Sequence, residues 1–227
     1  MPPGQSKLGF RILPAPPRLS ADVVSGFRGL APANLADAMG RFNFIDPGIR
    51  SRSGVALCGL ATTVLCRPAD NLMVHKALEL AEPGDIVVVS TGGNTTSAVF
   101  GELMCHTAAA KGLGGIVVDG AIRDVDGITA LGFSAFSRTV SPGGCDKDGP
   151  GEINVPISCG NTVVMPGDII VGDEGGVAVV PRDHAGAVLR LVGELMARER
   201  SRIAEIGRGQ LYKAEIDDAL RRKGVIE

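Results

Sequence analysis

The sequence predicts an α/β fold in one domain with terminal arms, and three observations lead to it. Residues 82–120 give a strand, a helix and a second strand, which is a βαβ unit. Residues 153–180 are nearly all apolar and β-branched between turn residues, and such antiparallel-looking strands argue against a pure doubly wound sheet. The 32 glycines and 14 prolines among 227 residues supply many turns, so the elements should be short.

Composition excludes several classes of protein. The net charge is −2 without a stripe of lysine and arginine, which argues against a nucleic-acid partner. Aromatic residues are only 4%, too few to form stacking platforms for bases or sugars. No apolar run approaches the roughly 18 residues of a membrane span, and the N-terminus lacks the apolar core of a signal peptide, so we expect a cytoplasmic protein without membrane contact. The five cysteines contain no C-x-x-C, which favours free thiols.

The first third of the chain predicts an arm, two short helices and a buried strand. Residues 1–18 hold five prolines and should form an irregular arm over the surface or over a neighbouring subunit. Ser20 is placed to cap a helix, and Pro32 to begin a second one that Gly40 ends. Residues 54–66 are apolar and uncharged, as in a strand or hairpin buried on both faces.

The middle of the chain holds the βαβ unit. Asp70 and Asn71 are the candidate caps for a helix over 72–81. Residues 82–94 read as a turn, a strand and a glycine loop, with a helix after them up to Lys111. The next strand begins near Gly114. Because the two strands should be parallel, the loops that leave their carboxyl ends should lie at one edge, where ligands bind in such sheets.

The second half of the chain is mostly β, with helices at its end. The turn Pro83-Gly84-Asp85 before one strand is echoed by Pro166-Gly167-Asp168 before another, which suggests a structural pseudo-repeat. The remaining elements expected from periodicity and turn residues are a short helix over 124–131, a strand over 133–139, a loop over 140–152, short strands over 153–180, a long amphipathic helix over 182–206 and a charged helix over 214–223.

Common catalytic motifs are absent from the sequence. It contains neither a P-loop, nor a dinucleotide fingerprint, nor a serine-hydrolase elbow, nor an H-E-x-x-H zinc motif. We interpret the three histidines, His75, His106 and His184, as packing or surface residues, because they are far apart in sequence and fall within or beside helices. No lysine falls inside an apolar strand that would lower its pKa, which disfavours a Schiff-base mechanism.

The segment from residue 91 to 124 carries the remaining candidate chemistry. The two loops at one sheet edge should bring together Glu102, Asp119, Arg123 and Asp124. A guanidinium holds a carboxylate through two hydrogen bonds, and an adjacent carboxylate binds a divalent ion. The alternative is structural: Asp124 would merely cap its helix and Arg123 would pair with a surface acid.

The sequence resembles the aldolase branch of the RraA-like family. The stretch GELM followed by KGLGGIVVDGAIRD carries the branch's motif, an acid, twenty residues and then Arg-Asp, here Glu102 and Arg123-Asp124. DAMGR, PADN, PGDIVVV and residues 154–181 extend the similarity over most of 20–205. The resemblance implies a layered β/β/α sandwich of the swivelling-domain kind, with an arm at 1–19, a catalytic domain at 20–206 and a helical tail at 207–227.

For the site, the resemblance implies that Arg123 binds the carboxylate of pyruvate and that Asp124 is the direct protein ligand of Mg²⁺ or Mn²⁺. It also implies that the backbone amides of Leu103 and Met104, within Gly101 to Met104, receive the substrate. Periodicity alone allows the helix to begin near Thr95, but amides bind an anion only where they lack intrahelical partners, so the helix should start near Gly101. Glu102 would hold water on the metal, although its family counterpart is often Asp.

The activity implied is metal-dependent cleavage of 4-hydroxy-4-methyl-2-oxoglutarate or 4-carboxy-4-hydroxy-2-oxoadipate to pyruvate plus pyruvate or oxaloacetate. Decarboxylation of oxaloacetate is the side activity, because it leaves the same enolate. The branch belongs to bacterial breakdown of protocatechuate or gallate. It also implies homotrimers or homohexamers with the site at a subunit boundary. Glu194, Glu199 or neither of them would contribute from a neighbouring subunit.

The alternative function is a non-catalytic one. Regulators of ribonuclease E activity share the fold and act by binding a partner protein. That branch lacks the acid after the arginine, so the intact pair Arg123-Asp124 favours catalysis. A methyltransferase, the third possibility, needs a glycine-rich nucleotide loop that the sequence does not contain.

Overall fold

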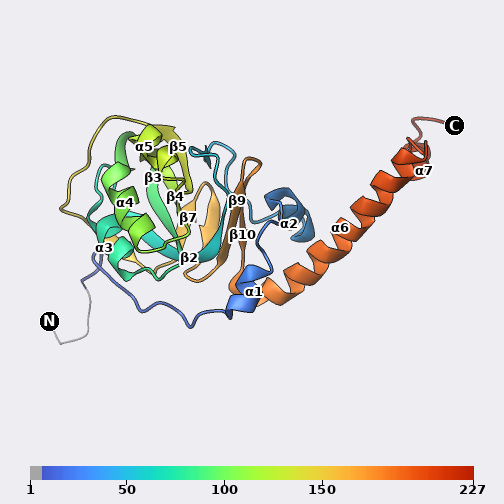
Figure 1. Cartoon of the computed structure of the whole chain (residues 1–227). Helices are drawn as coiled ribbons and strands as arrows, with labels where there is room; N and C mark the ends of the chain where they lie inside the picture. The colour runs from blue at the N-terminus through green and yellow to red at the C-terminus, as the bar shows by residue number, and fades with distance from the viewer. Residues whose placement is uncertain (1–6) are drawn as a thin grey trace.

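The structure is a computed structural model that describes residues 7–227. It is a mixed α/β fold with a mostly parallel central sheet, flanked by helices on one side and by further strands and helices on the other (Figure 1). The helices are α1 (Ala21–Ser25), α2 (Pro32–Ala38), α3 (Leu72–Leu80), α4 (Glu102–Ala110), α5 (Val125–Ala130), α6 (Ala185–Gly207) and α7 (Ala214–Arg222). The strands are β1 (Arg50–Ser51), β2 (Leu57–Cys66), β3 (Ile86–Phe100), β4 (Gly115–Ile122), β5 (Ala135–Val140), β6 (Gly151–Ile153), β7 (Ile157–Cys159), β8 (Thr162–Val164), β9 (Ile169–Asp173) and β10 (Gly176–Val180).

Strand β2 joins the parallel and the antiparallel parts of the main sheet. Its second half pairs in parallel with β3, from Ala61 opposite Ile86 onwards, and its first half pairs antiparallel with β9. Strand β4 is parallel to both β3 and β5, which confirms the βαβ unit. The stretch expected as a strand or a hairpin is therefore a single strand that serves two sets of neighbours.

The alternation of side chains along β3 explains the layers. Val87 and Val89 face the helices and belong to the core beneath α3 and α4, whereas Ile86 and Val88 face the strands β7 to β10. All four are fully buried, which is why this strand reads as a continuous apolar run. The layered β/β/α sandwich expected from the resemblance is confirmed.

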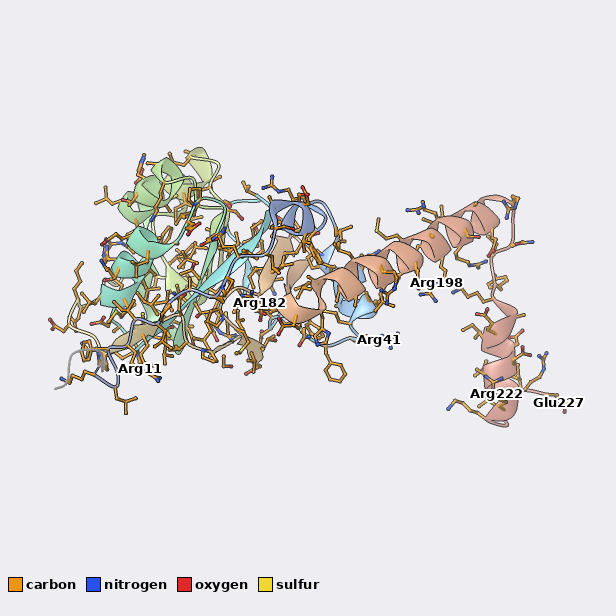
Figure 2. The ribbon with its side chains drawn as sticks, turned by 90° about the horizontal axis from the view of Figure 1, so that it is seen from below. Arg11, Arg41, Arg182, Arg198, Arg222 and Glu227 are labelled. Carbon is orange, nitrogen blue, oxygen red and sulfur yellow. The ribbon has the colours of Figure 1, made fainter. Side chains whose placement is uncertain are left out.

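A third core lies on the outer side of β9 and β10, where α1, α2 and the first part of α6 cover it. Its members include Phe27, Leu35 and Val188, which are buried. Beyond this contact α6 leaves the body as an arm, with α7 at its far end (Figures 1 and 2). Side chains along the arm such as Ile203 are exposed.

Helix starts follow the expected signals, and at α3 the structure decides between two candidate caps. The Ser20 hydroxyl accepts a bond from the Val23 amide at the start of α1, and Pro32 is the first residue of α2. At α3 the cap is Asp70 alone, whose carboxylate accepts from the Leu72 amide at 3.0 Å, while Asn71 makes no capping bond.

The prediction of a glycine loop at residues 91–94 is wrong. Strand β3 continues to Phe100, and Gly92 and Gly93, with φ of 65° and 76°, form a bulge inside it. The pairing with β4 shifts there, since Ser90 lies opposite Asp119 but Asn94 opposite the next residue, Gly120. Two left-handed glycines therefore bend the strand without ending it.

The two Pro-Gly-Asp turns are alike in structure as well as in sequence. Gly84 and Gly167 have φ of 85° and 82°, which a type II turn requires. Each turn's aspartate accepts a bond from the amide three residues before it, Asp85 from Glu82 and Asp168 from Met165, both at 2.9 Å. The turns precede β3 and β9, which both pair with β2.

The N-terminal arm, as far as it is described, lies along β6 of its own chain. Backbone bonds join Leu13 to Ile153 and Gly151 to Gly9. The Glu152 carboxylate, which is 5% exposed, accepts from the Gly9 amide and from both Nε and Nη2 of Arg11 at 2.6–2.8 Å. Residues 1–6 of the expected arm lie outside the described residues. No helix between residues 7 and 227 is both long and apolar enough to cross a membrane.

Glu152→Gln is expected to lower the free energy of unfolding by about 1 to 3 kcal/mol at pH 7, because it removes the charge from a buried acceptor of three hydrogen bonds. Urea denaturation measures the change. Glu79→Gln is the control, since Glu79 is exposed and its carboxylate pairs with Lys76 on the surface. Equal stability of wild type and Glu152→Gln would contradict the role given to this carboxylate.

The same pair of proteins gives a pH dependence. The hydrogen bond from Arg11 holds the pKa of Glu152 below its usual value, so the carboxylate stabilises the fold fully above its unfolded pKa of about 4.3. That contribution is lost as the pH falls through the lower, folded pKa. The stability difference between wild type and Glu152→Gln should be constant from pH 8 to 5 and shrink below about pH 4.

Candidate functional site

A pocket of about 480 Å³ lies where the carboxyl ends of β3 and β4 meet the start of α3 and the loop 141–150. Two kinds of wall enclose it. One is formed by the starts of α4 and α5, with Gly101 to Met104 and Arg123-Asp124, and the other by Asn71, His75 and Lys147. The edge of the parallel strands thus carries the hollow, as their topology predicts.

The start of α4 presents free backbone amides to this pocket. Gly101 is extended and precedes the helix, which begins at Glu102 and not near Thr95. The Glu102 amide donates to Oδ2 of Asp124 at 3.3 Å. Within residues 7–227 the amides of Leu103 and Met104 have no acceptor. They point out of the positive end of a helix dipole, the arrangement that binds anions.

Asp124 has a left-handed backbone with φ of 56° and ψ of 41°, which is uncommon for a residue other than glycine. Although it precedes α5, its side chain makes no capping bond to that helix. The carboxylate turns instead toward the start of α4 and lies 3.4 Å from Nε of Arg123. The structural alternative, in which Asp124 caps its own helix, is therefore not what the fold adopts.

Two glycines make room for these side chains. A Cβ on Gly101 would lie 2.7 Å from Oδ2 of Asp124 and 3.0 Å from Cγ of Arg123. A Cβ on Gly127 in α5 would lie 2.6 Å from Oε1 of Glu102. The contacts to the two carboxylate oxygens are too short for a carbon side chain, so the carboxylates of Asp124 and Glu102 pack against bare backbone.

The expected fourth member of the cluster, Asp119, lies elsewhere. It is buried, pairs with Arg138, and accepts from the Gly160 amide at 2.7 Å. It stands within β4, before the strand's end, and ties the sheet to the β7–β8 layer. Of the four residues expected to meet, Glu102, Arg123 and Asp124 line the pocket and Asp119 does not.

The sequence interpretation missed three residues of the opposite wall. Asn71 and His75 are one helical turn apart on α3, and Lys147 comes from the loop 141–150. The side-chain Nδ2 of Asn71 donates to the Val99 carbonyl at 3.2 Å. The side-chain Oδ1 of the same residue is buried without a partner in the described part of the chain. Partial desolvation, and then the charge of Lys147, lower the pKa of His75, so it is neutral at pH 7. The only sequence signal that could have joined Asn71 and His75 is their i, i+4 spacing, which places them on one face of a helix.

The carboxylate of Asp70 holds this wall in place. It is 1% exposed and accepts from the amides of Asp148 and Gly149 at 2.8 Å, as well as from Leu72 at the start of α3. Burial alone would raise the pKa of Asp70, but these backbone hydrogen bonds outweigh it and the pKa is lowered. One buried charge thus joins the start of α3, which carries His75, to the loop that carries Lys147.

The donor set suits a hard divalent cation held largely by water and substrate. No group of three histidine, cysteine, aspartate or glutamate side chains converges on one point among the residues the structure describes. The Asp124 carboxylate, however, is about half exposed in a polar pocket. Mg²⁺ is commonly bound through one or two carboxylates while keeping several waters, and this site offers that arrangement.

Comparison with known proteins identifies the family. A family model named RraA-like, described as Aldolase/RraA, matches residues 32–179. The chain belongs to the RraA-like family. Its match spans β1 to β10 and includes every residue that the pocket takes from the motif.

Relatives and solved structures agree with this membership. A protein of Halalkalibacterium halodurans named as a putative 4-hydroxy-4-methyl-2-oxoglutarate aldolase is 37% identical over 80% of this chain and 87% of its own length. A crystal structure of an uncharacterised Pseudomonas syringae protein matches with a TM-score of 0.75 and 28% identity, covering 85% of this chain and 96% of that one. The RNA-processing inhibitor RraA of Thermus thermophilus matches with a TM-score of 0.62 and 27% identity, over 67% of this chain and 93% of that one.

The left-handed backbone of Asp124 predicts an inverted preference between glycine and alanine. Asp124→Gly should be more stable than Asp124→Ala by about 1 kcal/mol, because a Cβ is strained at positive φ and both variants lack the carboxylate. At Asp126, inside α5, the order should be the usual one, with alanine favoured by about 1 kcal/mol. Denaturant unfolding of the four variants measures this, and the same order at both positions would show that Asp124 is not left-handed.

Proposed function

We propose that this chain is a divalent-metal-dependent aldolase that releases pyruvate from 4-hydroxy-4-methyl-2-oxoglutarate, 4-carboxy-4-hydroxy-2-oxoadipate or both. The observation that carries the proposal is the placement of Arg123 and Asp124 beside two free amides of α4 in one pocket. The name of the Halalkalibacterium halodurans relative supports the same chemistry.

The pyruvate half of the substrate would lie against α4. Its carboxylate is held by the guanidinium of Arg123 and by the amides of Leu103 and Met104. Asp124, whose carboxylate lies 3.4 Å from Nε of Arg123, would hold Mg²⁺ or Mn²⁺. When bound, the metal acts as a Lewis acid and neutralises the charge that collects on the 2-oxo oxygen.

Cleavage requires that a proton leave the 4-hydroxyl group. The C4–O bond then becomes a carbonyl, the C3–C4 bond breaks, and its electron pair moves toward the 2-oxo group until a proton returns to C3. Glu102, packed on Gly127 at the pocket wall, is the carboxylate available to hold that proton through water. In oxaloacetate the bond that breaks is the one to the C4 carboxylate, which leaves as CO₂, so decarboxylation is proposed as the side activity.

We propose a homotrimer or homohexamer with the pocket near a subunit boundary. Leu103 beside the pocket is 82% exposed, and the arm of α6 extends away from its own pocket (Figure 1). Glu194 and Glu199 lie on this arm, and Glu199 accepts a hydrogen bond from Asn34 of the same chain at 2.8 Å. Neither lines the pocket of its own chain, so a catalytic role for either would require a neighbour's pocket.

The first prediction for this function concerns metal and the paired residues. Pyruvate release from the three substrates should need Mg²⁺ or Mn²⁺ and stop with EDTA. Asp124→Asn should abolish it, and Arg123→Ala should lower kcat/KM about 100- to 1,000-fold, the loss expected for one group that stabilises developing charge. Arg222→Ala, in α7 at the end of the arm, is the control and should retain activity (Figure 2). If none of the three substrates gives metal-dependent release of pyruvate, the proposed aldolase activity is refuted.

The second candidate is a protein-interaction module, which the likeness to the Thermus thermophilus inhibitor RraA favours. In that case a pull-down would recover ribonuclease E or a helicase, and Asp124→Asn would leave the binding intact. Recovery of neither partner, together with loss of pyruvate release in Asp124→Asn, leaves the aldolase as the function.

A further inference from the structure

The pocket offers more groups that can bind an anion than the carboxylate of pyruvate alone requires. Arg123, the Leu103 amide and the Met104 amide already account for one carboxylate. His75 and Lys147 lie on the other wall, near enough for the charge of Lys147 to lower the pKa of His75. Within residues 7–227 Lys147 has no carboxylate within salt-bridge distance, since the neighbouring Asp146 pairs with Arg67 instead.

We propose that His75 and Lys147 bind a second carboxylate, the one on C4 of the substrate, and so select aldol adducts of pyruvate with another 2-oxo acid. This inference rests on the proposed function, whose pyruvate position defines the opposite wall. Lys147 supplies the charge, and the neutral imidazole of His75 supplies one N–H donor. Adducts of simple aldehydes, which carry only hydrogen and an alkyl group on C4, leave both groups without a partner.

The backbone segments that carry these two groups are fastened to each other. His75 stands on the first turn of α3, and the amides of Asp148 and Gly149 beside Lys147 bond to the same Asp70 carboxylate that caps α3. The backbone bonds Asn71 to Asp146 and Asp146 to Ala69, at 3.0 and 2.9 Å, fasten the loop a second time. A site fixed by buried hydrogen bonds loses little entropy when a ligand binds.

The position of Cys145 places the second wall close to the first. The charges of Lys147 and Arg123 both act on the Cys145 thiol, which also lines the pocket. Both cations therefore line one cavity of about 480 Å³ with Cys145, a size that suits one small dicarboxylate.

The test compares a dicarboxylate with a monocarboxylate substrate. For 4-hydroxy-4-methyl-2-oxoglutarate, Lys147→Met should lower kcat/KM about 10- to 100-fold, mainly through KM, as expected for one lost hydrogen bond to a charged group. Lys147→Arg should restore most of the loss. His75→Leu should lower kcat/KM about 3- to 10-fold, the loss of one neutral donor. For 4-hydroxy-2-oxopentanoate, which lacks the second carboxylate, all three variants should match wild type.

Lys76→Met is the matched control, because Lys76 is the neighbour of His75 on α3 and pairs with Glu79 outside the pocket. Unchanged kcat/KM for the dicarboxylate in Lys147→Met would overturn the inference, and so would an equal loss for both substrates.

Metal-dependent exchange of the C3 protons of pyruvate in D₂O separates this failure from failure of the proposed function. Exchange needs only the pyruvate position, so Lys147→Met should exchange at the wild-type rate. Absence of exchange in wild type would refute the aldolase itself and the inference with it.

Discussion

The contact on which the site depends is the packing of Arg123 and Asp124 against the bare backbone of Gly101. It joins the end of β4 to the end of β3, so the motif pair and the first amides of α4 face the same space. A left-handed Asp124 is the backbone cost of that approach, since its carboxylate serves the Glu102 amide and not its own helix. Burial of both strands in the parallel sheet fixes their ends, so the strain is tolerated where the chemistry is proposed.

The opposite wall depends on a different kind of contact, a buried charge that bonds mainly to backbone amides. Asp70 joins the start of α3 to the loop after β5 through three amides, and it thereby fixes residues far apart in sequence. One wall carries the residues of the family motif and the other carries His75 and Lys147. In the proposed function, the first would govern the chemistry common to pyruvate aldolases and the second the choice of substrate.

Much of this fold follows from sequence because its signals are local. The apolar run of β3, the Pro32 start of α2 and the two Pro-Gly-Asp turns each specify their own geometry. The bulge at Gly92 and Gly93 was not predictable in the same way, because glycines end a strand or bend it according to the neighbouring strand's register. Asp119 was misplaced because its partners are brought to it only by the fold: Arg138 stands on the neighbouring strand β5, and Gly160 lies between β7 and β8. Lys147 was missed because its loop reaches the pocket through Asp70 and the backbone bonds at Asp146, which join residues far apart in sequence.

The most direct test of the central claim is a titration of the protein with Mn²⁺, followed by electron paramagnetic resonance, with and without pyruvate. The account predicts one Mn²⁺ site per chain that pyruvate tightens, because metal and ketoacid would share the space between Arg123 and Asp124. Asp124→Asn should remove the site, and Arg123→Ala should leave Mn²⁺ bound but insensitive to pyruvate. Mn²⁺ binding that neither pyruvate nor Asp124→Asn alters would contradict the assignment of this pocket.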